Sequence, residues 1–296
     1  MLRSWDVPYF ATERELLSIF ESAKWGRVHA STSPIDELRI GAFLIRAVDG
    51  HVKLICSEET EARLRQELLE GPGRALGLLR QGYFTLHGSC IVVNGRAVSI
   101  VGSSGTGKST LAAILAQRGA TLVSDGMTPI HPETLLIAPG PPRTKLNDAS
   151  LRLLGQEPSN FPLVHPESIK RYFPVRGVME RFGNAPRPSE KDVVATRAAS
   201  DTSNEQLRLR LVLIVEDAEE TEIVPLVGAR TLIELIKNVY LVEYLPPEHS
   251  SVLMQGAAAI IQRGVQVRVL RRKKVPDQLV EIAEAIEREA TALTHD

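Results

Sequence analysis

The sequence predicts an α/β protein of 296 residues, on three observations. The apolar run "AVSIV" leads through a glycine-rich loop into "STLAAILAQ", which has helical spacing. Residues 83–101 read as two strands on either side of Asn94-Gly95, a pair typical of a tight hairpin turn. Three amphipathic helices are predicted near the C-terminus, in residues 228–245, 250–264 and 278–293.

The first 80 residues predict a separate α+β layer. A helix is expected over residues 11–23, and two strands are expected in residues 38–48 and 51–57, joined by a turn at Asp49-Gly50. Residues 57–73 predict a second helix, with a serine cap, an acidic first turn and an end at Gly71-Pro72-Gly73. We interpret this region as an accessory layer.

Beyond the glycine-rich loop, the pattern alternates between strands and helices. Strands are expected at 121–125 and around 134–139, and a short capped helix at 147–155. The polar, weakly patterned residues 186–206 predict a long surface loop. The runs 207–217 and 222–226 predict a second hairpin. The chain therefore divides into an accessory region (1–80), a catalytic core (81–245) and a C-terminal helical region (246–296).

Composition excludes several classes of protein. Apolar residues make up 43% and charged residues 24%, as in a globular protein, and the net charge of −1 argues against a nucleic-acid partner. The N-terminus has acidic residues and no apolar signal region, and no run reaches the ~18 apolar residues of a membrane span. Cys56 and Cys90 lie in strand-like runs and are expected to be buried free thiols. A cytoplasmic protein without a membrane partner is the resulting expectation.

The loop "GSSGTGKS" has the spacing of a nucleotide phosphate loop. Glycines let backbone N–H groups approach phosphate oxygens, and the following helix adds its positive dipole end. Lys108 would bridge phosphates, and the Ser109 hydroxyl would ligate Mg²⁺. The expected nucleotide contacts are Gly102, Ser103, Ser104, Gly105, Thr106, Gly107, Lys108, Ser109 and Thr110.

Two residues flank this loop. Asp125 ends the run "TLVSD", where its carboxylate could ligate Mg²⁺ or act on an attacking hydroxyl; the alternative is a turn aspartate before Gly126. His87 lies in "TLHGS", and a lone histidine between apolar residues is more often a packing residue. The predicted hairpin, however, would bring His87 to the sheet edge that delivers Gly102.

The order of the motifs "LHG", "VGSSGTGKST" and "LAQRGATLVSD" resembles the catalytic domain of HPr kinase/phosphorylase. Among its relatives, the chain is most similar to serine kinases encoded beside lasso-peptide biosynthesis genes. The stretch "IVPLVGARTLIELIKNVY" extends the resemblance over about residues 82–240. It implies a P-loop kinase core of the type shared with phosphoenolpyruvate carboxykinase, with an N-terminal α+β layer and C-terminal helices.

The same resemblance implies an ATP- and Mg²⁺-dependent serine kinase. His87, Lys108 and Asp125 would be catalytic, and Ser109 with Asp125 would hold the metal. Bifunctional relatives usually carry a second aspartate at Gly126 and a glutamate at Thr110, so their absence favours a one-way kinase. The acceptor would be a serine of a peptide or small protein, such as the C-terminal serine of a lasso precursor, and the resemblance also allows a homo-oligomer. The alternatives are a nucleotide-dependent regulatory module and a small-molecule kinase.

Three groups of basic residues remain as substrate candidates. Arg143 and Lys145 could contact phosphates or an acidic peptide end, or they could belong to a solvated loop. Lys170 and Arg171 precede a proline-containing strand and could contact substrate or phosphate. The run at 268–274, "RVLRRKK", is interpreted as an exposed strand end rather than a binding patch.

Overall fold

The computed structural model describes residues 37–48, 51–178, 206–245, 250–273, 275 and 278–293. The predicted helix at 11–23, the turn at Asp49-Gly50 and nearly all of the polar segment 186–206 lie outside these residues. In the part that is described, no helix combines the length and the apolar character needed to cross a bilayer.

The elements keep their chain order in their labels. The strands are β1 (Glu37–Ile40), β2 (Phe43–Val48), β3 (His51–Ile55), β4 (Phe84–Leu86), β5 (Gly88–Val93), β6 (Arg96–Val101), β7 (Thr121–Ser124), β8 (Thr128–Ile130), β9 (Arg143–Asn147), β10 (Lys170–Pro174), β11 (Leu209–Asp217), β12 (Glu222–Pro225) and β13 (Gln266–Arg272). The helices are α2 (Ala62–Leu68), η1 (Leu69–Gly73), α3 (Arg74–Arg80), α4 (Lys108–Gln117), α5 (Asp148–Leu153), η2 (Pro158–Asn160), α8 (Ala229–Lys237), η3 (Val242–Tyr244), α9 (Ser250–Gln262) and α10 (Leu279–Ala292).

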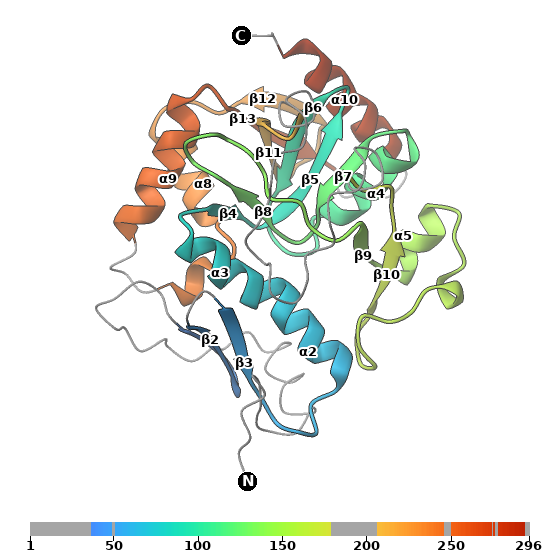
Figure 1. The fold of residues 1–296 in the computed structure, drawn as a ribbon. Helices are drawn as coiled ribbons and strands as arrows, with labels where there is room; N and C mark the ends of the chain where they lie inside the picture. The colour runs from blue at the N-terminus through green and yellow to red at the C-terminus, as the bar shows by residue number, and fades with distance from the viewer. Residues whose placement is uncertain are drawn as a thin grey trace.

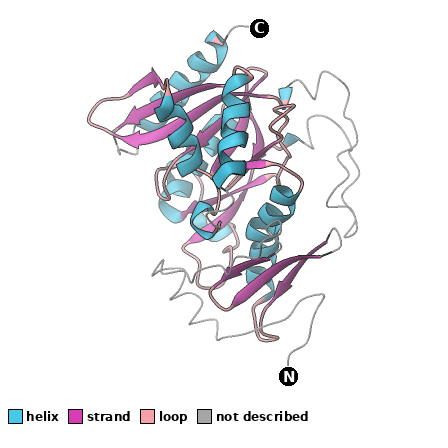
Figure 2. Ribbon diagram, turned by 90° about the vertical axis from the view of Figure 1, so that its left-hand side faces the viewer, coloured by secondary structure: helices cyan, strands magenta, loops and turns pink. Residues whose placement is uncertain are grey.

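A mixed six-stranded sheet forms the centre, in the order β12-β13-β11-β6-β5-β7 (Figures 1 and 2). Strands β6, β11 and β13 are parallel, and β5 runs antiparallel to both β6 and β7. Asn94 and Gly95 have φ values of 49° and 78°, as a two-residue turn between β5 and β6 requires. The predicted α/β class and the first hairpin are confirmed.

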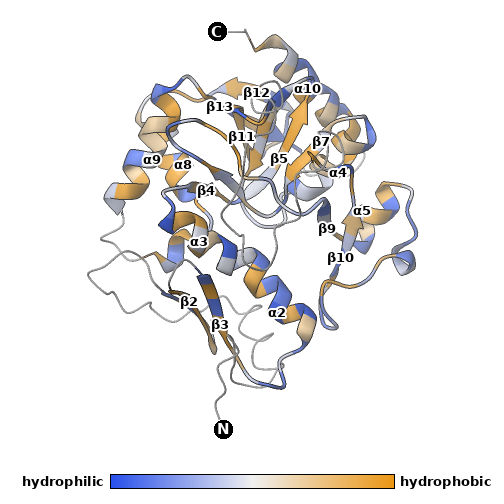
Figure 3. Cartoon of the chain, in the orientation of Figure 1, coloured by the Kyte–Doolittle hydropathy of each residue, from blue (hydrophilic) through white to orange (hydrophobic). Residues whose placement is uncertain are grey.

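Helices cover both faces of this sheet. Ile100 and Leu213 pack with α4 and α10 on one face, whereas Val101 and Val212 pack with α8 and α9 on the other. Because successive side chains of a strand point to opposite faces, strands covered on both faces must be apolar throughout. The hydrophobic colour of β5 in Figure 3 reflects this requirement. Cys90 and Cys56 are buried free thiols, as predicted.

The second predicted hairpin is wrong. Strand β13 lies between β11 and β12, so the runs at 207–217 and 222–226 are not neighbours. Seven residues of β11 pair with β13 in parallel, from Leu211 with Gln266 to Asp217 with Arg272. Strand β13 takes this inner position with buried side chains on both faces, Val269 on one and Leu270 on the other, and the four-residue β12 is left at the edge. The boundary predicted at residue 245, between the catalytic core and the C-terminal region, therefore separates β13 from β11, the strand with which it pairs.

The N-terminal layer is a three-stranded sheet with a helical segment packed on it. Strands β1, β2 and β3 form an antiparallel sheet whose buried side chains, including Phe43 and Leu54, meet Leu68 and Leu76 of the helices. The predicted strand 38–48 is broken by a turn at Gly41, where φ is 58°. In Figure 1 this layer lies below the central sheet, with α2 and α3 between the two.

The predicted helix end at Gly71-Pro72-Gly73 is also wrong. The chain stays helical from Ala62 to Arg80, and residues 69–73 form a widened turn that includes Pro72. Such a turn accommodates a residue without a backbone N–H inside a helix. The N-cap is Glu61 rather than Ser57: its side chain accepts a hydrogen bond from Leu64 N at 3.0 Å.

Two further differences lie close to the glycine-rich loop. The predicted strand around 134–139 is reduced to isolated bridges, and β8 at 128–130 pairs with β4 instead. The predicted strand at 83–93 is interrupted at His87, between β4 and β5. The short helix α5 begins at its predicted cap, where Asn147 Oδ1 accepts from Ser150 N at 2.8 Å.

Candidate active site

The glycine-rich loop joins β6 to α4 and has the backbone shape of a phosphate loop. Gly102 has a φ of 145°, and a Cβ there would lie 3.0 Å from the carbonyl oxygen of Val215. Gly107, with φ 82°, is the N-cap of α4 in the left-handed conformation. Both positions therefore need glycine, for close packing at the first and for the backbone turn at the second. The helix N-terminus faces the loop, as anion binding requires.

Lys108 is folded back over this loop. Its Nζ donates to the carbonyl oxygens of Gly102 at 2.7 Å and Ser103 at 2.8 Å, and the residue is 8% exposed. Burial, and then the nearby charge of Lys170, lower its pKa to about 8. The ammonium group is thus held at the loop by two carbonyl oxygens, with the charge of Asp125 partly offsetting the fall in its pKa, and a phosphate would supply further negative charge.

Asp125 is the centre of a hydrogen-bond cluster. Its Oδ1 accepts from the hydroxyls of Ser109 at 2.9 Å and Ser89 at 2.6 Å, and its Oδ2 accepts from the backbone N–H of Lys145 at 3.1 Å. The donors come from α4, β5 and β9, three different elements that converge where β7 ends. The carboxylate is therefore oriented toward the first turn of the phosphate-loop helix.

His87 lies at the break between β4 and β5. Its backbone N–H donates to Asn238 O at 2.7 Å, and its ring meets Tyr240 edge to face, with centroids 5.7 Å apart. Burial, and then the charges of Lys108 and Lys170, lower the pKa of His87 to about 4, and the charge of Asp125 opposes them. Gly88 pairs with Val101, so His87 lies next to the start of the phosphate loop in the sheet register, and the lowered pKa keeps the imidazole neutral at neutral pH.

Lys170 and Arg171 of β10 belong to different surroundings. Lys170 is exposed, and its charge lowers the pKa of both His87 and Lys108. Arg171 instead binds Asp148 at 2.8 Å and the carbonyl oxygen of Phe161 at 2.8 Å. Neighbouring side chains of a strand point to opposite sides, which explains why Lys170 and Arg171 have different surroundings.

Arg143 and Lys145 lie on strand β9, not in a loop, and both contact the N-terminal layer. Arg143 Nη2 is 2.5 Å from Glu70 Oε2, and Lys145 forms an ion pair with Glu67. The Arg143 guanidinium also stacks over the Tyr172 ring at 4.1 Å, and the Tyr172 hydroxyl donates to Glu67. The segment α2–η1 is thereby bound to the core beside Asp125.

A small cleft lies between this segment and the loop after β7. Its lining includes charged residues from both the N-terminal layer and the core, with Asp125 among them. The residues are Glu70, Gly71, Arg74, Asp125, Gly126, Met127, Pro141, Arg143, Lys145 and Tyr240. One wall is therefore built by the accessory layer.

The residues present fit Mg²⁺ bound together with a nucleotide. Among the described residues, no three His, Cys, Asp or Glu side chains gather as a metal cluster. Magnesium in nucleotide sites takes only one or two protein oxygens, with phosphates and waters completing its shell. The Ser109 hydroxyl and Asp125 carboxylate, 2.9 Å apart, supply hard oxygen ligands of this kind.

Several residues of the site were not predicted from the sequence: Ser89, Glu67, Glu70 and Arg272. The interpretation of 268–274 as an exposed strand end is wrong for Arg272, which is 3% exposed and contacts the phosphate loop. Leu270, two positions earlier and fully buried, lies on the same face of β13. That spacing is the signal that could have revealed the burial of Arg272.

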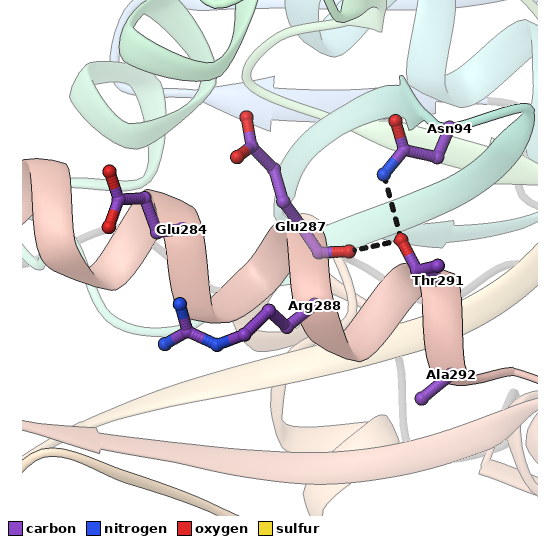
Figure 4. A pocket seen from close by; sticks show the side chains of 6 residues that line it. All are labelled: Asn94, Glu284, Glu287, Arg288, Thr291 and Ala292. Carbon is purple, nitrogen blue, oxygen red and sulfur yellow. Dashed lines mark hydrogen bonds between the residues drawn. The ribbon is translucent and has the colours of Figure 1, made fainter.

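A second hollow lies on the outer surface, beside the Asn94-Gly95 turn (Figure 4). Its lining consists of Asn94, Glu284, Glu287, Arg288, Thr291 and Ala292. The Asn94 amide donates to Thr291 Oγ1 at 2.8 Å, and this contact ties the turn to α10. None of the residues around Asp125 lines this hollow.

No protein-family model matches the sequence, and no curated protein matches it. Among solved structures, the chain is similar to the HPr(Ser) kinase/phosphatase from Coxiella burnetii, with a TM-score of 0.32 and 12% sequence identity. The similarity covers 70% of this chain and 96% of that chain. It is a distant similarity of overall arrangement, and the chemistry of the site follows from its own residues.

Proposed function

We propose that this protein is an ATP-dependent kinase, with a P-loop core of the HPr-kinase type, that phosphorylates a serine hydroxyl of a peptide or small protein. One observation supports this most directly. The carboxylate of Asp125 is hydrogen-bonded to Ser109, in the first turn of the phosphate-loop helix, and it also lines the cleft between the N-terminal layer and the loop after β7. A nucleotide site and an acceptor site thus share one carboxylate.

The loop would hold the triphosphate by its backbone N–H groups and by Lys108, which leaves its two carbonyl partners when phosphate oxygens arrive. Ser109 and Asp125 would hold Mg²⁺, which when bound neutralises charge on the β- and γ-phosphates. Burial of Lys108 strengthens its attraction to phosphate because little water competes. This arrangement favours a nucleotide over a singly charged anion.

In the transfer, the serine oxygen of the acceptor attacks the γ-phosphorus in line. The bond from that phosphorus to the β–γ bridging oxygen breaks, ADP leaves, and the hydroxyl proton passes to the Asp125 carboxylate. His87, whose pKa is lowered to about 4 mainly by burial, is neutral, and its one ring N–H would donate a hydrogen bond to the acceptor oxygen and orient it. Gly126 follows Asp125 directly, so the neighbouring position offers no carboxylate for the reverse reaction.

The acceptor would enter the cleft between the core and the N-terminal layer. Arg143 and Lys145 bind carboxylates of that layer, which suggests that an acidic group of a peptide can take the place of Glu70 or Glu67. A peptide ending in serine, as in a lasso precursor, would carry such a group beside its hydroxyl. It is therefore the first acceptor to test.

The test is incubation of the purified protein with labelled MgATP and peptides ending in serine. Matched peptides with a C-terminal alanine or a C-terminal amide report the need for the hydroxyl and for the carboxylate. The expected result is label on the serine peptide alone. Tight MgATP binding with no label on any peptide, small protein or small hydroxyl compound would contradict the proposal and favour a regulatory module, whereas label on small compounds alone would identify a small-molecule kinase.

A further inference from the structure

Arg272 is a buried cation at the end of the inner strand β13, directly beneath the phosphate loop. It is 3% exposed, and its Nη2 donates to the carbonyl oxygen of Thr106 at 2.5 Å. Its Nη1 makes a longer contact of 3.3 Å with the carbonyl oxygen of Lys273. A Cβ added to Gly107 would lie 3.4 Å from Nη2, so glycine also allows the loop to approach this guanidinium.

Because the peptide bond is planar, the contact between Arg272 and the Thr106 oxygen also fixes the direction of the Gly107 N–H. In a trans peptide, the carbonyl oxygen of one residue and the N–H of the next point in opposite directions. Arg272 holds the Thr106 oxygen toward the sheet, and therefore the N–H of Gly107 is turned away from the sheet, toward the side where Lys108 begins the helix. This N–H is one of the phosphate-binding donors that a loop of this kind provides.

We propose that Arg272 is a positioning residue for nucleotide phosphates, acting through the Thr106–Gly107 peptide. The inference rests on the proposed nucleotide-binding function and adds to it a residue outside the motif. The guanidinium carries a charge that polarises the peptide it binds, so the Gly107 N–H becomes a stronger donor. Its own charge also adds to the positive potential behind the loop.

The surroundings of Arg272 support a role beyond packing. A buried arginine is costly unless its donors are satisfied, and Arg272 Nε has no hydrogen-bond partner in the described part of the chain. Burial lowers the pKa of the guanidinium, and Asp217, opposite it on β11, raises it. An apolar residue would fill this position at lower cost if the position served only to fill space.

The experiment compares Arg272→Met with Arg271→Met. Arg271 is the next residue of the same strand, but it is directed outward and forms an exposed ion pair with Glu222 at 2.7 Å. Affinities for MgATP and for magnesium tripolyphosphate, which lacks the nucleoside, would be measured by calorimetry. We expect Arg272→Met to weaken both by the same factor of roughly 10 to 100, the range of a hydrogen bond from a charged donor. Arg271→Met would change neither.

Arg272→Lys and Arg272→Gln guard against a folding defect in Arg272→Met, because each keeps one donor for Thr106. Thermal melting establishes which variants are folded, and affinities refer to the folded fraction. Arg272→Lys should restore part of the tripolyphosphate affinity. Folded Arg272 variants that all bind tripolyphosphate within about twofold of the unmodified protein would overturn the inference while leaving nucleotide binding intact. Failure of the unmodified protein to bind MgATP would instead overturn the proposed function itself.

Discussion

The Ser109 hydroxyl and the Asp125 carboxylate are joined by a 2.9 Å hydrogen bond, although they lie 16 positions apart in the chain. Helix α4 carries the first and the end of β7 carries the second. Because Ser109 follows the phosphate-loop lysine, this bond places the carboxylate at the position where nucleotide and acceptor would meet. Because the same carboxylate also accepts from Ser89 and from the backbone N–H of Lys145, a substitution that tests its chemistry must keep its shape.

Asp125→Asn keeps the shape of the side chain and removes its charge and its ability to accept a proton. We expect turnover to fall by roughly 10² to 10⁴, the usual contribution of a general base. Nucleotide affinity should stay within about tenfold, or about 1.4 kcal/mol. The control variant is Glu287→Gln, which removes the carboxylate of an ion pair with Arg118 on the surface. Equal turnover in the two variants would exclude Asp125 as the base.

His87 should make the stability of the protein depend on pH. Its pKa is lowered from the ordinary 6.5 to about 4 in the folded chain, mainly by burial. Between these values the unfolded chain binds the proton more readily, so the free energy of unfolding rises with pH across this window. The stability is fully present above pH 6.5 and is lost toward pH 4, by up to about 3 kcal/mol.

The measurement is urea unfolding of the protein and of His87→Gln between pH 4 and pH 7.5. All other residues are common to the two proteins, so the difference between the two curves isolates His87. The His87→Gln curve should be flatter over the acidic window. Parallel curves would show that His87 is solvated rather than buried beside Lys108. In turnover assays, His87→Ala should abolish transfer while MgATP affinity stays within about tenfold.

Some features of the site and of the fold around it depend only on residues close together in the sequence, and these features were predicted. The phosphate loop, the Asn94-Gly95 turn and the cap at Asn147 depend on spacing and backbone preference, and the structure has the turn and the cap where the sequence puts them. The position of β13 could not be predicted in this way. Whether β11 pairs with β12 or with β13 is decided by which strand can be buried on both faces, a property of the whole sheet.

The same distinction explains the residues that were missed. Glu67 and Glu70 lie on an exposed-looking helical face in the sequence, and only the docking of α2–η1 on β9 gives them partners. Arg272 stands in a basic run, where charge suggests solvent, yet the inner position of β13 buries it. Long-range pairing, not local pattern, determines these contacts.

The two ion pairs between the N-terminal layer and β9 should influence the acceptor and not the nucleotide. Glu67→Gln combined with Glu70→Gln frees the charges of Lys145 and Arg143 for an acidic acceptor. We expect the KM for an acidic peptide to fall two- to fivefold, matching the ~0.5–1 kcal/mol of a partly exposed ion pair. The kcat and the MgATP affinity should not change.

Glu37→Gln is the matched control for this double variant. It removes a carboxylate from the same layer, but its partner Arg46 lies within that layer at 2.9 Å and not in the cleft. A control variant that lowered KM equally would attribute the effect to net charge. An unchanged KM in the double variant would place the acceptor elsewhere.

Lys108 should limit nucleotide binding on the alkaline side. Its pKa is lowered to about 8, first by burial and then by the charge of Lys170. Phosphate binds the charged form, so MgATP affinity should be constant below pH 8 and fall by up to about tenfold per pH unit above it. Lys170→Met removes the like charge and should move this break to higher pH. The control is Lys237→Met, which removes an exposed lysine that pairs with Glu234 on α8 and should not change the pH at which MgATP affinity begins to fall.

Gly126 offers a final test of the carboxylate beside it. Its φ is 82°, and a Cβ there would meet no atom within 4 Å, so aspartate or asparagine, which tolerate this backbone region, can be introduced. Gly126→Asp places a new carboxylate directly beside Asp125 on the cleft, and a like charge so close disfavours the ionised form of the pair. The acid limb of the pH–rate profile should therefore move upward by about one unit in Gly126→Asp. Gly126→Asn, equal in shape but uncharged, should keep the original profile. Identical acid limbs in the two variants would mean that the proton taken from the acceptor does not pass to Asp125.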